Sequence, residues 1–377
     1  MKKVLFIASV DFHFTSFHIP YIKYFQQQGI EVHIAAKSGE RVKELEALGV
    51  IFHNVDFSRS PYSPKLFTAF LALKKLLEKE QFDLVHVHTP VAAFLGRLAA
   101  RSTKTEPVLY TAHGFHFYKG APVLNWLIYY PMEKIAARWT HGLITINEED
   151  YNRAKGFKLK RKGGLFFVHG VGLDLEDYFM PQNFDKAAQK EKMGFKKTDK
   201  ILVCVGEFTK NKNQVQVIHA LNEAVKINPD IHMLFVGRGE QEEALKRYVE
   251  ELHLSNNIHF LGYRRDIPEI LWAGDAFILT SKREGLPRAM MEAMAAGLPV
   301  IATDIRGNRD LISHGVEGYL VPIGDIKKTK EAILQVLKES EEVDNMKQNV
   351  KEKIKAYAIE NTLQEMDKIY KTFIKSE

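Results

Sequence analysis

The amino-acid sequence predicts an α/β protein made of two doubly wound domains that face each other across a cleft. Short apolar runs alternate with amphipathic stretches along nearly all of the chain. The runs are almost continuously apolar, which is typical of parallel strands covered on both faces of a sheet. The alternation breaks once, over residues 178–198, and 377 residues is long for one compact core. Ligands of such folds bind beyond the carboxyl ends of the strands, so functional side chains are expected there.

The first half of the chain contains six expected strands and three expected helices. The strands cover residues 4–10, 32–37, 83–89, 108–113, 142–147 and 165–170. The helical segments cover residues 20–28, 65–79 and 124–139. In the second helix the leucines recur at helical spacing on one side, which predicts a face packed against the sheet.

The second half repeats this pattern. Its strands cover residues 200–206, 232–237, 258–262, 276–281 and 299–304, and its helices cover 213–227, 240–252 and 287–296. The final segment, about 341–376, is expected to be helix with no strand after it. We therefore expect one domain over 1–180, a second over 181–360, and a C-terminal helix over 361–377 that packs back on the first domain.

The composition indicates a globular enzyme, with 45% hydrophobic and 27% charged residues. The single cysteine, Cys204, lies in an apolar run and cannot form an internal disulfide. The apolar run at residues 4–10 is too short for a signal peptide, and no run approaches the roughly 20 residues that span a bilayer. We expect a cytoplasmic protein.

The net charge of +6 is confined to the first half. Residues 1–180 hold 23 basic and 17 acidic residues, whereas the remainder holds 30 of each. This asymmetry indicates an anionic partner or an ordinary solvated surface. The segment 113–139, with Lys119 and Trp126, and the basic stretch 153–162 suit contact with anionic lipid headgroups at the membrane. The alternative is a core-facing helix beside an exposed basic loop. Nucleic acid is not expected, because no motif for it accompanies these charges.

The most informative segment covers residues 281–304. It contains a strand end, a loop with Glu284, and a helix that is expected to open at Pro287 and to carry Glu292. A helix amino terminus favours a diphosphate, and the carboxylates can accept hydrogen bonds from sugar or ribose hydroxyls. The amides that can point at the diphosphate belong to Gly285, Leu286 and Arg288. Spacing alone leaves another interpretation open, in which Glu284 complements the helix and Glu292 makes a surface ion pair.

Glu284, seven residues and Glu292, followed by AMAAGLPVIATD, resemble the E-x7-E motif of retaining family 4 glycosyltransferases. The similarity extends over nearly the whole chain, through DLVHVHTP, TAHGFHF, VHGVGLD, VGEFTKNKN, VGRGEQEEAL, FLGYRRDI and RGNRDLI. It implies the GT-B fold of two Rossmann-like domains and transfer of a hexose or N-acetylhexosamine from a nucleotide-diphosphate sugar. Within the family the chain is most similar to bacterial enzymes of capsule, exopolysaccharide or lipid-linked oligosaccharide synthesis. UDP as the nucleotide and a polyprenyl-diphosphate-linked glycan as the acceptor follow from family tendency.

The resemblance also implies roles for single residues. Glu284 would contact the transferred sugar, Glu292 the ribose, and Lys212 the donor diphosphate. His113 would lie near the reacting oxygen, to orient it, to help electrostatically or to accept its proton. Glu207 departs from the family, which usually has arginine there, so a second cation for the phosphates is needed.

Several further positions are weaker candidates. The second cation is open among Lys210, Arg238, Arg283 and Arg288. The other donor-side candidates are Gly237 and Arg264. In the loop after the first strand, which contains no glycine between residues 9 and 20, Asp11 and His13 are candidates for acceptor or donor contact.

His86 and His88 lie on the same side of one expected strand, a spacing that suggests a metal. No third ligand is evident, and the family works without a bound metal. We therefore expect no metal and no cofactor. Two other functions stay open: a nucleotide-sugar epimerase or hydrolase of the same fold, which needs no acceptor, and a non-catalytic nucleotide-sugar-binding subunit of a polysaccharide assembly complex.

Overall fold

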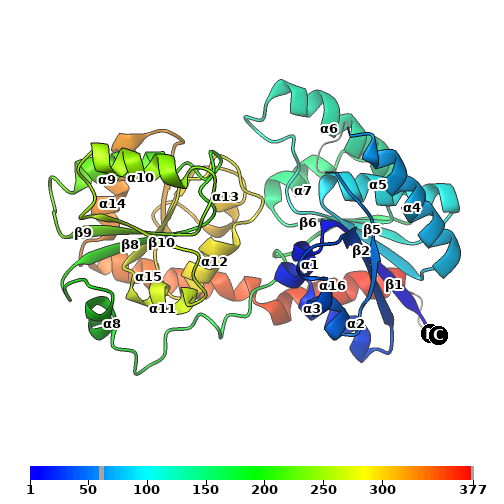
Figure 1. Ribbon diagram of the computed structural model, residues 1–377, viewed down its shortest axis with the longest axis horizontal. Coiled ribbons are helices and arrows are strands. Elements are labelled where there is room, and N and C mark those ends of the chain that lie inside the picture. The colour runs from blue at the N-terminus through cyan, green and yellow to red at the C-terminus, as the bar shows by residue number, and fades with distance from the viewer. Residues whose placement is uncertain (59–62, 375–377) are drawn as a thin grey trace. The chain divides into compact units, whose positions relative to one another are not determined.

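The computed structural model describes residues 1–58 and 63–374, which form two compact units, each built on its own parallel sheet (Figure 1). The first unit comprises Met1–Gly172 and Ile359–Glu377, and the second comprises Leu173–Ala358. Residues 375–377, the end of the expected C-terminal helix, lie outside the described residues. The predicted fold class of two doubly wound α/β domains is confirmed.

The sheet of the first unit has seven strands in the order β3-β2-β1-β4-β5-β6-β7. The strands are β1 (Lys3–Val10), β2 (Glu31–Lys37), β3 (Ile51–Asn54), β4 (Leu84–His88), β5 (Val108–Ala112), β6 (Gly142–Thr145) and β7 (Gly164–Phe167). The order changes direction between β1 and β4, which makes their carboxyl ends the topological switch point where ligands of such sheets bind. The edge strand β3 was not predicted, because it is short and only partly buried.

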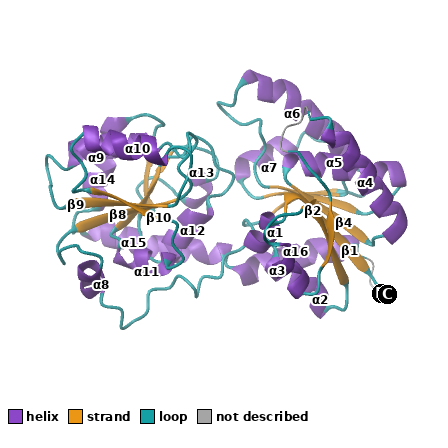
Figure 2. Ribbon diagram, in the orientation of Figure 1, coloured by secondary structure: helices purple, strands orange, loops and turns teal. Residues whose placement is uncertain are grey.

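Helices cover both faces of this sheet (Figure 2). They are α1 (Phe12–Phe17), α2 (Ile19–Gln27), α3 (Val42–Ala47), α4 (Lys65–Glu80), α5 (Pro90–Thr103), α6 (Val123–Ala136) with the 3-10 turn η1 (Ala137–Trp139), α7 (Glu148–Ala154) and α16 (Ile359–Phe373). The expectation of a loop after the first strand is wrong. Asp11 accepts a hydrogen bond from the amide of Phe12 at 2.8 Å and begins α1 there.

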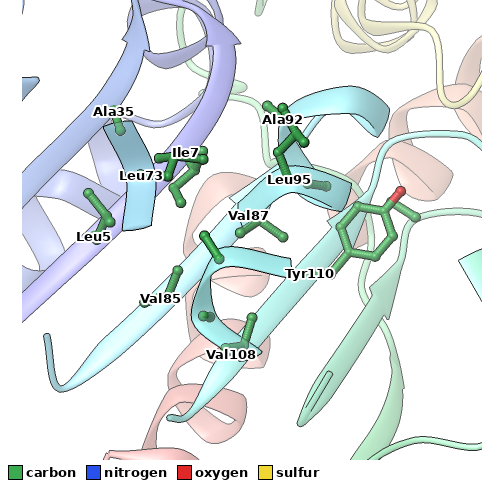
Figure 3. Close-up of a cluster of buried hydrophobic side chains, with 14 of the residues drawn as sticks. Leu5, Ile7, Ala35, Leu73, Val85, Val87, Ala92, Leu95, Val108 and Tyr110 are labelled. Carbon is green, nitrogen blue, oxygen red and sulfur yellow. The ribbon is translucent and has the colours of Figure 1, made fainter. Parts of the chain in front are cut away.

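Two apolar clusters hold the first unit together. Leu5 and Ile7 of β1 point into one cluster, and Val4 and Phe6 into the other, as the alternation of a strand requires. The first cluster joins β1, β4 and β5 to α4 and α5, and Figure 3 shows Leu73 of α4 facing the strand side chains. The second cluster joins β1 and β2 to α2 and α16. The sheet is therefore buried on both faces, as its apolar strands predicted.

The C-terminal segment is not the single helix that was expected. It consists of α15 (Glu341–Ile354), the 3-10 turn η2 (Lys355–Tyr357) and α16, and Ala358 between them is extended and bridges to Leu173. Helix α16 packs on the first unit, where the hydroxyl of Tyr24 donates to Asp367 at 2.6 Å. The chain therefore passes from the second unit back to the first at Ala358.

The second unit has a six-stranded parallel sheet in the order β10-β9-β8-β11-β12-β13. The strands are β8 (Lys200–Val205), β9 (Ile231–Val236), β10 (Ile258–Gly262), β11 (Ala276–Leu279), β12 (Val300–Thr303) and β13 (Gly318–Val321). The helices are α8 (Lys186–Lys192), α9 (Gln214–Ala224), α10 (Glu242–Glu251), α11 (Ile267–Ala273), α12 (Arg288–Ala295), α13 (Asn308–Leu311) and α14 (Ile326–Val336), with α15 and η2. Its switch point lies between β8 and β11. Of these strands, β13 was not predicted.

None of the helices in the described part of the chain is both long enough and apolar enough to cross a membrane.

Candidate functional site

In the second unit, two loops that carry predicted donor-binding residues are joined at the switch point. One loop follows β8 and the other follows β11. The amide of Lys282 donates to the carbonyl of Asn211 at 2.7 Å, and the side-chain amide of Asn211 donates to the carbonyl of Arg283 at 3.0 Å. Because these bonds run in both directions, the two loops hold a fixed relation at the carboxyl ends of the strands.

Lys212 and Glu284 are brought into direct contact by these loops. The Lys212 ammonium donates to Oε1 of Glu284 at 2.7 Å, and both side chains are partly buried. Arg306 donates to the main-chain carbonyl of Glu284 at 3.1 Å and so fixes this position from the other side. A lysine ammonium has three donors, so Lys212 can bind a phosphate oxygen while it stays bonded to Glu284.

Glu292 lies on α12 and is 9% exposed. Its Oε1 accepts hydrogen bonds from Arg288 at 2.9 Å and from the hydroxyl of Tyr178 at 2.9 Å. Burial, and then the charge of Glu292, raise the pKa of Tyr178 well above its usual range, so this hydroxyl stays a donor. The alternative of a surface ion pair does not describe this buried carboxylate.

Helix α12 starts one residue later than predicted. Pro287 is extended and occupies the N-cap position, and the helix begins at Arg288. Gly285 and Leu286 lie in the loop before it, partly buried. The loop is packed closely, because a side chain on Gly307 would come within 2.4 Å of the carbonyl oxygen of Gly285.

The other donor-side candidates differ in their surroundings. Gly237 has φ +144°, and a side chain there would approach the carbonyl oxygen of Gly206 to 2.1 Å, so its glycine has a structural reason. Arg264 is exposed and ion-paired with Asp266. The remaining candidates after β8 and β9, all exposed, are Glu207, Lys210 and Arg238. The cation that complements Lys212 therefore stays a prediction.

In the first unit, His113 follows β5 directly and meets the end of β4. Its Nε2 lies 3.1 Å from Nδ1 of His88, the last residue of β4. Burial lowers the pKa of His113 to about 4, so the ring is neutral at physiological pH. A neutral imidazole can accept a proton from a hydroxyl, which is one of the roles predicted for it.

The reasoning that His88 lacks further histidine neighbours is wrong. His13, His18, His88 and His113 each present a ring nitrogen, and these nitrogens all lie within 4.8 Å of one another. His13 and His18 were overlooked because α1 folds back over the strand ends, which sequence spacing does not reveal. His86 is not part of this group, since its two nitrogens bond to Tyr370 at 3.0 Å and Thr111 at 2.8 Å.

Asp11 is buried and binds the backbone. Its two oxygens accept from the amides of Phe12 at 2.8 Å and Arg41 at 2.9 Å. A side chain on Gly39 would come within 2.6 Å of the same carboxylate. Asp11 therefore fixes α1 and the loop after β2.

The aromatic and basic segment is divided between core and surface. Trp126 packs against the apolar cluster, with the Arg153 guanidinium 4.6 Å from its ring centre, so it is not an exposed aromatic. Lys119 is exposed, and its amide donates to Glu149 at 2.8 Å. The large exposed apolar side chains of α6, which the sequence reasoning missed, are Val123, Leu124, Leu127 and Ile135.

Comparisons with known proteins agree with this architecture. The model of glycosyl transferases group 1 matches residues 185–353, and the model called glycosyl transferase 4-like matches residues 3–147. The structure of Anabaena Alr3699/HepE in complex with UDP superimposes with a TM-score of 0.80 at 20% identity, over 98% of this chain and 99% of that one. Together these findings define a glycosyltransferase with the GT-B fold.

Two relatives place the chain more closely. It is 40% identical, over 99% of its length and 97% of the relative, to EpsD of Bacillus subtilis (strain 168), which is named provisionally as a glycosyltransferase. It is 34% identical, over 76% of its length and 74% of the relative, to an Escherichia coli UDP-Gal:alpha-D-GlcNAc-diphosphoundecaprenol alpha-1,3-galactosyltransferase. The chain belongs to family 4 of the glycosyltransferases. This favours neither an epimerase or hydrolase nor a non-catalytic subunit.

Proposed function

We propose that the protein transfers a hexose or N-acetylhexosamine from a UDP-sugar, with retention of configuration, to a sugar carried on a polyprenyl diphosphate at the cytoplasmic face of the membrane. The observation that carries the proposal is the Lys212–Glu284 pair at the switch point of the second unit. The relative from Escherichia coli supports the substrates, because its name gives a UDP-sugar donor and a diphosphoundecaprenol acceptor.

In this proposal the second unit takes the donor. The Lys212 ammonium and the amides before α12 neutralise the diphosphate, Glu284 accepts hydrogen bonds from the sugar, and Glu292 accepts them from the ribose. The diphosphate needs no metal ion for this, because a preorganised ammonium and amides stabilise the charge that develops on the leaving group. Donor binding should therefore be unchanged by a chelator.

The transfer step exchanges one bond for another at the anomeric carbon. The bond from this carbon to the diphosphate oxygen breaks, and its electron pair stays on the diphosphate. The acceptor hydroxyl oxygen attacks from the same face, which retains the configuration, and its proton passes to the leaving phosphate oxygen. His113, neutral and next to His88, orients or polarises the acceptor hydroxyl.

Contact with an anionic membrane is part of the proposal. Leu124 and Leu127 of α6 are 61% and 69% exposed, beside exposed Lys119, Lys134 and Arg138. Apolar side chains flanked by cations suit the interface of an anionic bilayer, where the lipid-linked acceptor would be held.

The test is a panel of UDP- and GDP-sugars with polyprenyl-diphosphate-linked acceptors, read by mass spectrometry, with NMR of the product for the anomeric configuration. One UDP-sugar should add one residue with its donor configuration kept. An inverted product would contradict the retaining mechanism. Hydrolysis or epimerisation of the donor without any transfer would contradict the proposed acceptor reaction.

A further inference from the structure

The four histidines at the switch point of the first unit form a cluster for which the transfer reaction requires only His113. His13 lies in α1, His18 between α1 and α2, His88 at the end of β4, and His113 just after β5. The ring centres of His18 and His88 are 4.2 Å apart, and those of His13 and His113 are 4.9 Å apart. Two separate parts of the chain therefore contribute two imidazoles each.

Two of these rings present a buried nitrogen with nothing to bond to. Within residues 1–58 and 63–374, Nε2 of His13 and Nε2 of His88 are buried and have no hydrogen-bond partner. His88 is 1% exposed and His13 is 9% exposed. Buried polar atoms are nearly always paired, since a missing partner costs free energy, so two such atoms in one cluster point to a ligand between the rings.

The rings are in the protonation state that a metal requires. Burial lowers the pKa of His18 to about 3 and of His113 to about 4, and it lowers the pKa of His13 and His88 well below the usual value. A metal binds the lone pair of a neutral imidazole, so no proton must leave before binding at neutral pH.

The spacing of the nitrogens is close to that of a metal site. Zinc bound tetrahedrally at 2.0–2.1 Å from each nitrogen sets neighbouring ligand nitrogens about 3.3 Å apart. Nδ1 of His88 and Nε2 of His113 are 3.1 Å apart, whereas the widest separation in the cluster is up to 4.8 Å. Closing the site requires a turn of one or two rings. A cavity of about 20 Å³ for the centre of a water-sized sphere adjoins His18, His88 and His113, which is room for one water or one ion.

We propose that His13, His18, His88 and His113 bind one divalent transition-metal ion, with zinc the first expected. Four imidazoles suit zinc, copper, nickel or cobalt, whereas magnesium and calcium need oxygen ligands that the cluster lacks. The ion ties α1 to the ends of β4 and β5 and so makes the amino-terminal segment rigid. This inference goes beyond the proposed function, since it concerns neither the donor nor the acceptor.

The experiment measures metal binding to the full chain without a histidine tag, stripped with a chelator and without any sugar substrate. Zinc is titrated in competition with a chromophoric chelator, and the bound metal is counted by mass spectrometry. The cluster variants are His13→Gln, His18→Gln and His88→Gln. The matched controls are His86→Gln, a buried histidine of the same strand bonded elsewhere, and His53→Asn, from the pair formed with His33 at 2.8 Å.

The wild type and both controls should bind one zinc per chain, and each cluster variant should bind it at least about 100-fold more weakly. Absence of a bound equivalent in the wild type, or equal loss in the controls and the cluster variants, would overturn the proposal. If a variant fails to fold by circular dichroism, cobalt on the wild type decides. Strong visible bands of tetrahedral cobalt support the site, and the weak bands of octahedral cobalt contradict it. Donor binding is measured separately, so failure here leaves the proposed transfer untouched.

Discussion

Replacing Lys212 by methionine tests whether this ammonium acts on the donor or only on its neighbour Glu284. The pair is joined at 2.7 Å and partly buried, so the loss of the cation leaves a carboxylate without its partner. We expect a fall in the free energy of unfolding of about 1–2 kcal/mol, less than for a fully buried pair. If Lys212 also neutralises the leaving diphosphate, kcat/KM should fall by about 10²–10³, the effect of one preorganised donor in other enzymes.

A double-mutant cycle with Glu284→Gln separates the two roles. In the double variant no unpaired carboxylate remains, so thermal stability should return close to that of Glu284→Gln alone. Transfer should not return, because the diphosphate still lacks its cation. The matched control is Lys226→Met, which breaks an exposed lysine–glutamate pair of 2.6 Å in the same unit and should change neither quantity appreciably.

The assay is initial-rate kinetics of transfer with the donor at varied concentration, together with thermal unfolding of each variant. The decisive comparison is between Glu284→Gln and the double variant. If adding Lys212→Met to Glu284→Gln costs no further activity, Lys212 acts only through Glu284, and its assignment to the diphosphate is refuted.

Three other predictions follow from contacts and pKa shifts. Glu292→Gln should raise the KM for the donor about 10-fold or more with a smaller change in kcat, whereas Tyr178→Phe, which removes one hydrogen bond to Glu292, should have a smaller effect; equal KM values in all three proteins would contradict the ribose assignment. Because burial lowers the pKa of His13, His18, His86, His88 and His113, the unfolded chain binds more protons as the pH falls below about 6.5, so the melting temperature should drop between pH 7 and pH 5 and the drop should be shallower in His86→Gln; a melting temperature independent of pH would contradict this burial. The double variant Leu124→Glu, Leu127→Glu should cosediment with anionic vesicles about 10-fold less or weaker still, while Ile227→Glu, at an exposed apolar position of the second unit, should bind them as the wild type does; vesicle binding retained in the α6 variant would exclude this surface.

The sequence was sufficient for the fold class because the strands are buried on both faces and are therefore nearly continuously apolar. It failed where burial is partial or local chemistry dominates. Strand β3 is short and half-exposed, and α1 depends on the Asp11 cap rather than on an apolar period. Ala358 interrupts the last helical pattern through a tertiary bridge to Leu173, a contact that no local pattern predicts.

The candidate site was predictable to the extent that its residues follow strands. Lys212 follows β8 and Glu284 follows β11, and parallel strands on either side of a switch point bring such loops together. The Arg288 and Tyr178 contacts of Glu292 were not foreseen, because Tyr178 comes from the segment before the second sheet. On α6 the aromatic residues were expected at the surface, but Trp126 packs inward and the aliphatic side chains lie outside.

The two switch points have opposite electrostatic character, which argues for a division of labour between the units. In the second unit, charged side chains meet: an ammonium on a carboxylate at Lys212 and Glu284, and a guanidinium on a carboxylate at Arg288 and Glu292. These groups can exchange partners with an anionic, hydroxyl-rich ligand at little electrostatic cost, as a nucleotide sugar requires. In the first unit, the strand ends carry neutral imidazoles whose charged form burial disfavours. A site of that kind suits an uncharged hydroxyl or a metal ion rather than a phosphate. The donor phosphates therefore belong to the second unit, and the acceptor hydroxyl to the first.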